Sequence, residues 1–220
     1  MSNKKVNDLR SALELLQSID GQLVETNEEV DPMGELSGVY RHVGAGGTVM
    51  RPTKEGPAMI FNNVKGHPGA RVAIGLLASR KRVGYLLNCE PERLGFLLKD
   101  SVNNPIKPVV IENKKAKCQE VKYFADDPDF DIRKLVPAPT NTLEDAGPYI
   151  TFHRMCFQSK DEISIFLQPG ARHIGYFREL AEAKGEALPI SISIGVDPSI
   201  EIASCFEAPT TPLGYDELQI

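Results

Sequence analysis

Apolar positions recur at helical spacing in several segments of the first half of the chain, with strand-like runs between them. A helix is predicted over 9–16 and ends before the turn at Asp20-Gly21. A second apolar stripe predicts a helix that starts at Asp31-Pro32, with the aspartate as cap, and stops at Gly44. Further helices are expected at 80–88 and 91–102, and strands at 22–30, 58–64 and 71–77. This alternation favours an N-terminal α/β layer domain over residues 1–117.

The second half has more proline and shorter periodic segments. Strands are predicted at 118–124, 150–158 and 163–167, the last two forming a hairpin around a polar turn. A helix from Ile174 is expected to end at Gly185. Isoleucine and serine alternate over 190–194, as in a half-buried strand, and Asp197-Pro198 is a second helix-start signal. We expect a second domain over residues 118–220.

Composition excludes some function classes. A net charge of −5 on 220 residues leaves no basic face for nucleic acid. No stretch is apolar enough to span a bilayer or to serve as a signal peptide. The four cysteines are far apart in sequence, as in reduced cytosolic proteins. We therefore expect a cytoplasmic protein.

Three motifs have ordinary interpretations that we favour. The glycine-rich run 44–47 follows a helix and lacks the spacing of a phosphate-binding loop, so a flexible connection is expected. The aspartates of 126–131 lack the glycine and glutamate of a calcium loop, so a solvated turn with a cap is expected. His42 and His67 are expected at the surface.

Candidate chemistry lies in the run 151–154 and at His173 and Glu217. A guanidinium binds a carboxylate or phosphate through two parallel hydrogen bonds, and a divalent cation accepts carboxylate oxygen and imidazole. On a strand, Arg154 would share a face with Phe152 and Cys156, so it would need an anionic partner among buried groups. That partner is either a structural carboxylate or a ligand. His173 could equally cap a helix.

Six further segments strengthen the functional interpretation. They are the residues of 7–12, 40–48, 56–62, 125–131, 137–142 and 205–212. With these segments the chain resembles the UbiD-type decarboxylases, and most closely the hydroxybenzoate and 3,4-dihydroxybenzoate (protocatechuate) decarboxylases. The resemblance covers all 220 residues and corresponds to the N-terminal portion of a longer family protein.

The resemblance implies an α+β architecture, with the N-terminal α/β domain followed by an incomplete split β-barrel like that of flavin reductases. Such a barrel binds prenylated FMN, with Mn²⁺ or another divalent cation and K⁺ at the cofactor phosphate. The implied substrate is a small aromatic carboxylic acid, from which the cofactor accepts electron density as carbon dioxide leaves. The implied partners are a flavin prenyltransferase that supplies the cofactor and further copies of the chain.

Residue roles follow from the same resemblance. Arg154 matches the catalytic arginine between cofactor and substrate carboxylate, and His173 and Glu217 match metal ligands. Tyr149 stands where the family has a third ligand. The positions that match cofactor-binding residues are Thr151, Phe152, His153, Arg154, Arg172 and His173.

Two alternatives remain open at this point. One is a non-catalytic remnant that keeps the fold without turnover. The other is a flavin-binding or reductase module that uses ordinary FMN. We expect the 220-residue polypeptide alone to bind metal and cofactor weakly and not to decarboxylate, since the family's general acid lies outside it.

Overall fold

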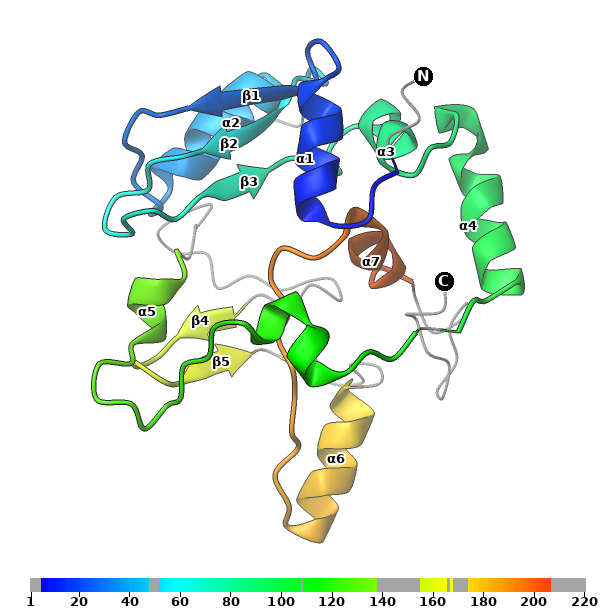
Figure 1. The fold of residues 1–220 in the computed structure, drawn as a ribbon. Coiled ribbons are helices and arrows are strands. Elements are labelled where there is room, and N and C mark those ends of the chain that lie inside the picture. Colours follow the sequence, from blue (N-terminus) through cyan, green and yellow to red (C-terminus); the bar gives the residue numbers. More distant parts are fainter. Residues whose placement is uncertain are drawn as a thin grey trace.

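A computed structural model describes residues 5–47, 52–107, 109–137, 155–165, 167 and 174–206. The first part of the chain forms a three-stranded sheet with helices beside it, and the second part contributes a hairpin and two longer helices (Figure 1). The elements, in chain order, are α1 (Leu9–Gln17), β1 (Leu23–Thr26), α2 (Glu35–Ala45), β2 (Ala58–Phe61), β3 (Val72–Ile74), α3 (Arg80–Leu86), η1 (Pro91–Arg93), α4 (Leu94–Asn103), η2 (Asn113–Lys115), η3 (Lys117–Gln119), α5 (Ile132–Leu135), β4 (Met155–Phe157), β5 (Ile163–Ile165), α6 (Ile174–Lys184) and α7 (Pro198–Ala203).

Strand β2 is the centre of the first sheet, whose order is β1-β2-β3. It runs parallel to β1, with Leu23 opposite Ala58, and antiparallel to β3, with Phe61 opposite Val72. Helix α2 lies in the connection between the two parallel strands, as a parallel pair requires a crossover. The predicted α/β layering of the first part is therefore confirmed.

Helix α1 starts where the sequence supplies a cap. The backbone N–H of Ser11 donates to the Asp8 carboxylate at 2.8 Å, and the backbone N–H of Asp8 donates to the Ser11 hydroxyl at 3.0 Å. These reciprocal bonds satisfy two of the amides that a helix start leaves unpaired. Ala12, Leu15 and Leu16 form the buried stripe of this helix.

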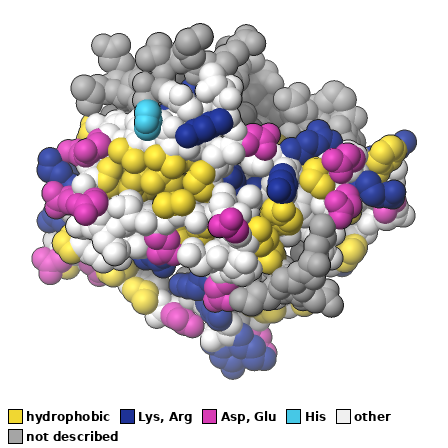
Figure 2. Space-filling view, turned by 90° about the horizontal axis from the view of Figure 1, so that it is seen from above, with side chains coloured by type: hydrophobic (Ala, Val, Ile, Leu, Met, Phe, Trp, Pro, Cys, Tyr) yellow, Lys and Arg dark blue, Asp and Glu magenta, His cyan; other side chains and the backbone are white. Residues whose placement is uncertain are grey.

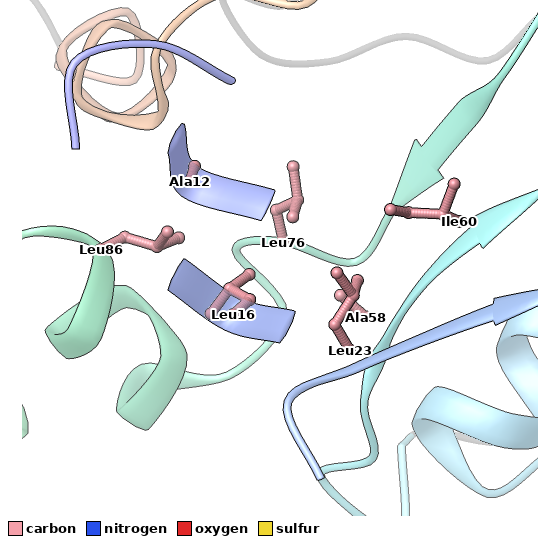
Figure 3. Packing of buried hydrophobic residues seen from close by; sticks show 7 residues of the cluster. All are labelled: Ala12, Leu16, Leu23, Ala58, Ile60, Leu76 and Leu86. Atoms are coloured by element: carbon pink, nitrogen blue, oxygen red, sulfur yellow. The ribbon is translucent and has the colours of Figure 1, made fainter. Parts of the chain in front are cut away.

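Two hydrophobic clusters lie on opposite faces of β2. Ala58 and Ile60 belong to the cluster under α1 and α3, whereas Met59 and Phe61 pack with α2. Figure 3 shows the first cluster, with Ala12 and Leu16 of α1 between Leu86 on one side and Leu23, Ala58 and Ile60 on the other. All four residues of β2 are buried, because a central strand covered on both faces exposes neither set of side chains.

Several predicted boundaries are wrong. Helix α2 begins at Glu35 and not at Asp31-Pro32. Asp31 instead forms a turn in which its carboxylate accepts the Met33 N–H, and its own N–H donates to the Glu35 carboxylate at 2.7 Å. The helix extends to Ala45, with Gly46 as its left-handed C-cap. The strands predicted at 22–30, 58–64 and 71–77 are shorter in the structure. Pairing between β1 and β2 extends over four residues, and pairing between β2 and β3 over three.

Two predicted strands are absent from the described part of the chain. Residues 118–124 contain the end of η3 and irregular structure, and 190–194 lie outside any helix or strand. The hairpin prediction is confirmed, since β4 and β5 pair antiparallel with Cys156 opposite Ser164. Among the described residues the second part has only this two-stranded sheet and no closed barrel, so the split barrel is not confirmed.

Helix α7 lies against the first part of the chain. A Cβ on Gly195, just before this helix, would lie 3.2 Å from Leu9 Cδ2 of the α1 start. Asp197 caps α7, its carboxylate accepting the Ser199 N–H at 2.7 Å, as the Asp197-Pro198 signal predicts. None of the described helices is both long and apolar enough to cross a membrane.

Candidate functional site

The structure does not describe the residues to which the sequence assigns chemistry. All the candidate residues, and Tyr149 with them, lie outside the described ranges. The candidates are Thr151, Phe152, His153, Arg154, Arg172, His173 and Glu217. Their roles therefore stay predictions, and only the elements beside them can be examined.

Two elements begin directly after these positions. Strand β4 starts at Met155, one residue after Arg154, and α6 starts at Ile174, one residue after His173. The expected helix after His173 is confirmed, and it ends before Gly185, whose φ of 70° is left-handed. The sequence therefore attaches the candidate arginine and histidine to regular elements.

The hairpin shows the surroundings of Cys156, two residues after Arg154. Cys156 is exposed, whereas Met155 and Phe157 are half-buried. On that exposed face the Gln158 side-chain amide donates to the Ser164 hydroxyl at 2.8 Å. Cys156 therefore lies among polar groups, while the expectation for the face of Arg154 falls outside the described residues.

No group of three or more histidine, cysteine, aspartate or glutamate side chains gathers in the described ranges to hold a metal ion. The aspartates of 126–131 form local bonds: Asp127 accepts the Phe124 N–H at 2.8 Å, and Asp131 caps α5. Arg133 lies beside Asp131 and lowers the pKa of its carboxyl to about 2. The predicted solvated turn with a cap is confirmed.

Acidic and basic side chains are intermixed on the surface of the first part. Figure 2 shows this for the face seen from above, where groups of both signs surround a hydrophobic area. His42 is exposed, and a ring nitrogen of the partly exposed His67 lies 3.4 Å from the Lys134 carbonyl oxygen. Both histidines are at the surface, as expected.

The glycine-rich run 44–47 ends α2 and is not a phosphate cradle. The Gly47 N–H donates to the Arg41 carbonyl oxygen at 3.1 Å, and Gly46 adopts the left-handed C-cap with φ of 86°. The carbonyls of Gly44 and Ala45 accept from Gly56 and Thr53. This run is tied to the following segment, so it is more ordered than the flexible connection that the sequence suggested.

The most deeply buried charge in the described ranges is Arg82 on α3, which is 1% exposed. Its guanidinium donates to the carbonyl oxygens of Gly75, at 2.6 Å, and Gly56. Burial lowers the pKa of Arg82, while Tyr40 and Glu55 act in the opposite direction. Because a buried cation needs acceptors, this arginine joins the turn before β2 to the turn after β3.

Tyr40 and Ser79 complete this junction. Burial raises the pKa of the Tyr40 phenol, against the opposing effect of Arg82. Ser79 caps α3 by accepting the Arg82 N–H, and its hydroxyl donates to the Glu55 carboxylate at 2.9 Å. This cluster was not predicted from the sequence, although the serine before Arg80 is a helix-cap signal. The two terminal guanidinium nitrogens of Arg82 have acceptors, whereas its buried Nε has none among the described residues, and the cluster joins β2, β3 and α3 structurally.

A cavity of about 650 Å³ lies beside α3, between α1 and η1. Leu15 and Ile19 contribute apolar surface, Arg80 and Lys81 are basic, and Glu55, Glu90 and Glu92 are acidic. Lys81 also lies over the ring of Tyr85, 5.9 Å from its centroid. Because basic and acidic side chains both line this cavity, its charge favours neither an anionic nor a cationic ligand.

Comparison with known proteins places the chain in a family. Residues 14–101 match the 3-octaprenyl-4-hydroxybenzoate carboxy-lyase N-terminal domain, and residues 151–220 match the Rift-related domain of the same carboxy-lyase. Gallate decarboxylase of Lactiplantibacillus plantarum is 49% identical over 97% of this chain and 47% of its own length.

Solved structures agree with these matches. The apo 3,4-dihydroxybenzoic acid decarboxylase from Enterobacter cloacae superposes with a TM-score of 0.87 at 53% identity, over 98% of this chain and 47% of that one. The UbiD-class enzyme HmfF from Pelotomaculum thermopropionicum, in an evolved dimeric form with prFMN, gives 0.79 at 28% identity, over 96% and 49%.

The chain spans about half the length of these relatives. The two matched domains belong to one family and together cover more than half of the residues. The mixed α/β fold is that of the UbiD-class structures. The chain belongs to the UbiD carboxy-lyase family.

Proposed function

We propose that this chain forms part of a UbiD-type carboxy-lyase that removes carbon dioxide from a phenolic acid without net oxidation. The observation that carries the proposal is the TM-score of 0.87, at 53% identity, with a 3,4-dihydroxybenzoic acid decarboxylase over 98% of the chain. The 49% identity to a gallate decarboxylase supports the same substrate class. Both relatives are named for hydroxylated benzoic acids, so a hydroxybenzoate is the proposed substrate.

The proposed cofactor is prenylated FMN, held with Mn²⁺ or another divalent cation and K⁺. Support for the flavin comes from the relative solved with prFMN. When bound, the flavin would supply the electron sink for decarboxylation. The metal proposal is supported by donor chemistry, because the imidazole of His173 and the carboxylate of Glu217 are groups that a divalent cation accepts.

The remaining roles belong to the run 151–154 and to Arg172. We assign Thr151, Phe152 and His153 to the strand along the cofactor, and Arg154 to the substrate carboxylate. A planar guanidinium holds a carboxylate at two points and so fixes its orientation. Arg172 would add a positive charge near the cofactor phosphate.

The organisation of the protein is part of the proposal. We place the domain boundary near residue 117, with a split-barrel domain from 118, a cytoplasmic location, self-association, and a flavin prenyltransferase as cofactor supplier. The dimeric form of one relative supports self-association. The alternatives are a remnant without turnover and a module that binds ordinary FMN.

The test uses a polypeptide in which residues 1–220 are followed by the region of gallate decarboxylase beyond its match to this chain. It is produced with and without a flavin prenyltransferase, and carbon dioxide release from gallate and 3,4-dihydroxybenzoate is measured. We expect release only with the prenyltransferase. The 220-residue polypeptide alone is the control, and it should bind cofactor weakly and show no turnover.

Two results would overturn the proposal. Equal turnover without the prenyltransferase would remove the cofactor assignment. A yellow protein that binds ordinary FMN and never decarboxylates would favour the flavin-binding module.

A further inference from the structure

The cavity beside α3 has an apolar floor and a charged rim. Its floor includes Leu15 of α1, which is 4% exposed, and the half-buried Ile19 and Tyr85. All of the described residues that line it lie between 15 and 92, inside the region that matches the family's N-terminal domain. Its volume of about 650 Å³ is within the range of ligand-binding pockets, roughly 300–1,000 Å³. The elements of one domain therefore form a cavity of ligand size.

The walls of this cavity are held in place by contacts between α3 and the segment that follows it. A Cβ at position 84 would lie 2.6 Å from the Cys89 carbonyl oxygen and 3.3 Å from Pro91 Cγ, so Gly84 allows η1 to approach α3 closely. The Arg80 Nε–H donates to the Pro91 carbonyl oxygen at 2.9 Å, which fixes η1 on the other side. The cavity is therefore preformed, as ligand pockets usually are.

The charged groups at the rim differ in whether they already have partners. Glu55 and Arg80 each make a hydrogen bond of 2.9 Å within the protein, and Lys81 lies over an aromatic ring. Glu90 and Glu92 are exposed, and in the part of the chain that the structure describes neither a hydrogen bond nor an ion pair engages their carboxylates. The rim groups that are open to a ligand are therefore chiefly hydrogen-bond acceptors.

We propose that this cavity binds a neutral benzene ring with two or three hydroxyl groups, the kind of phenol that decarboxylation of a hydroxybenzoate releases. The ring would pack on Leu15, Ile19 and Tyr85. Its hydroxyls would donate to the carboxylates of Glu90 and Glu92, directly or through water. The benzoate fits less well, because its own carboxylate would meet those carboxylates. The ligand's identity as a reaction product rests on the proposed function, whereas the binding chemistry rests on the cavity alone.

Cys89 lines the cavity and provides a readout that does not depend on activity. The 220-residue chain is alkylated with iodoacetamide, without oxygen so that catechol stays reduced. Catechol is either absent or present at about ten times its dissociation constant, as measured by calorimetry. We expect the reaction of Cys89 to slow by about tenfold, because only the unliganded fraction reacts. The exposed Cys156 of the hairpin is the internal control, and its rate should change by less than about twofold.

Two comparisons test how the ligand is recognised. 3,4-Dihydroxybenzoate should bind about fivefold more weakly than catechol, since it adds a negative charge beside the rim carboxylates. The double variant Glu90→Gln with Glu92→Gln should weaken catechol binding by about fivefold and strengthen that of the benzoate, because an amide accepts a weaker hydrogen bond and carries no charge. The matched control is Glu179→Gln with Glu186→Gln, which removes two exposed carboxylates outside the cavity lining and should change neither affinity.

Four results would overturn the proposal. Cys89 could react at the same rate with and without catechol. Toluene, a ring without hydroxyl groups, could protect Cys89 as well as catechol does, which would leave an apolar void without hydroxyl recognition. The benzoate could bind more tightly than the phenol. Loss of protection in Arg154→Lys would place catechol at the run 151–154 instead. A joined polypeptide that fails to decarboxylate, while catechol still protects Cys89, would contradict the proposed function and leave the binding site intact.

Discussion

The phenol ring of Tyr40 lies so close to the backbone of Gly75 that a Cβ at position 75 would overlap it. Gly75 also has φ of 79°, a conformation in which a side chain is strained. Its carbonyl oxygen accepts the Arg82 guanidinium. Gly75 therefore lets Tyr40 of α2 pack against the backbone, and its carbonyl oxygen accepts a hydrogen bond from Arg82 of α3.

We predict that Gly75→Ala destabilises the fold more than Gly66→Ala does. Gly66 has nearly the same φ, 80°, but nothing lies within 4 Å of the place that a Cβ would take, so it isolates the backbone strain. That strain costs about 1–2 kcal/mol, and overpacking against Tyr40 adds about 1–3 kcal/mol at position 75. Urea unfolding of the two variants measures the loss of stability in each. Equal losses of stability would show that the ring moves away without cost.

Arg82 provides the second prediction. Arg82→Met removes the donors to two carbonyl oxygens, those of Gly56 and Gly75, and should lower the free energy of unfolding by about 2–4 kcal/mol. The matched control is Lys81→Met on the same helix, at an exposed position, for which we expect less than about 1 kcal/mol. If the two variants unfold at the same urea concentration, the buried guanidinium is dispensable.

The sequence predicted the first part of the fold well, because its signals are local. The capping pair Asp8 and Ser11 and the apolar stripe of α1 are readable within a few residues. Strand ends were less predictable, since the extent of β2 depends on partners more than 30 residues away in sequence. The 190–194 alternation is a strand pattern, but no strand forms there among the described residues.

The same difference between local and long-range sequence signals applies around the candidate site. The helix after His173 and the hairpin after Arg154 follow from periodicity, and both are present. The Arg82 junction was missed because two of its members, Tyr40 and Gly56, are more than 25 residues from Arg82 in sequence. Nothing local to Arg82 distinguishes it from the exposed Arg80 and Lys81 beside it.

A third prediction concerns pH. Arg133 lowers the pKa of Asp131 from 3.8 to about 2, because the carboxylate accepts its hydrogen bonds. A lowered folded-state pKa favours the fold above the unfolded pKa, and this contribution is lost as the pH falls from about 4 through about 2. Arg133→Gln should raise the pKa of Asp131 toward 3.8, as followed by NMR of the carboxyl carbon. Arg178→Gln is the control, because it removes the distant ion pair with Glu182 and should leave the pKa of Asp131 unchanged. An unchanged pKa in Arg133→Gln would assign the shift to another group.

The fourth prediction tests Arg154 in the joined polypeptide described for the functional assay. Arg154→Lys should reduce decarboxylation by about 100-fold or more, because an ammonium cannot reproduce the planar two-point contact with a carboxylate. The unfolding midpoint should be nearly unchanged. Arg178→Lys is the control, since that residue lies on the exposed side of α6. Full turnover in Arg154→Lys would give this arginine a structural role.

The buried strand β2 has a consequence for how the first part of the molecule unfolds. The side chains of its four residues belong alternately to the two hydrophobic clusters. A shift of the strand register by one residue would therefore move each side chain into the opposite cluster. Loosening either cluster would remove packing from the strand that the other cluster also uses. The layers on the two sides of β2 should therefore melt in a single cooperative step, with matching hydrogen-exchange rates in α1 and α2.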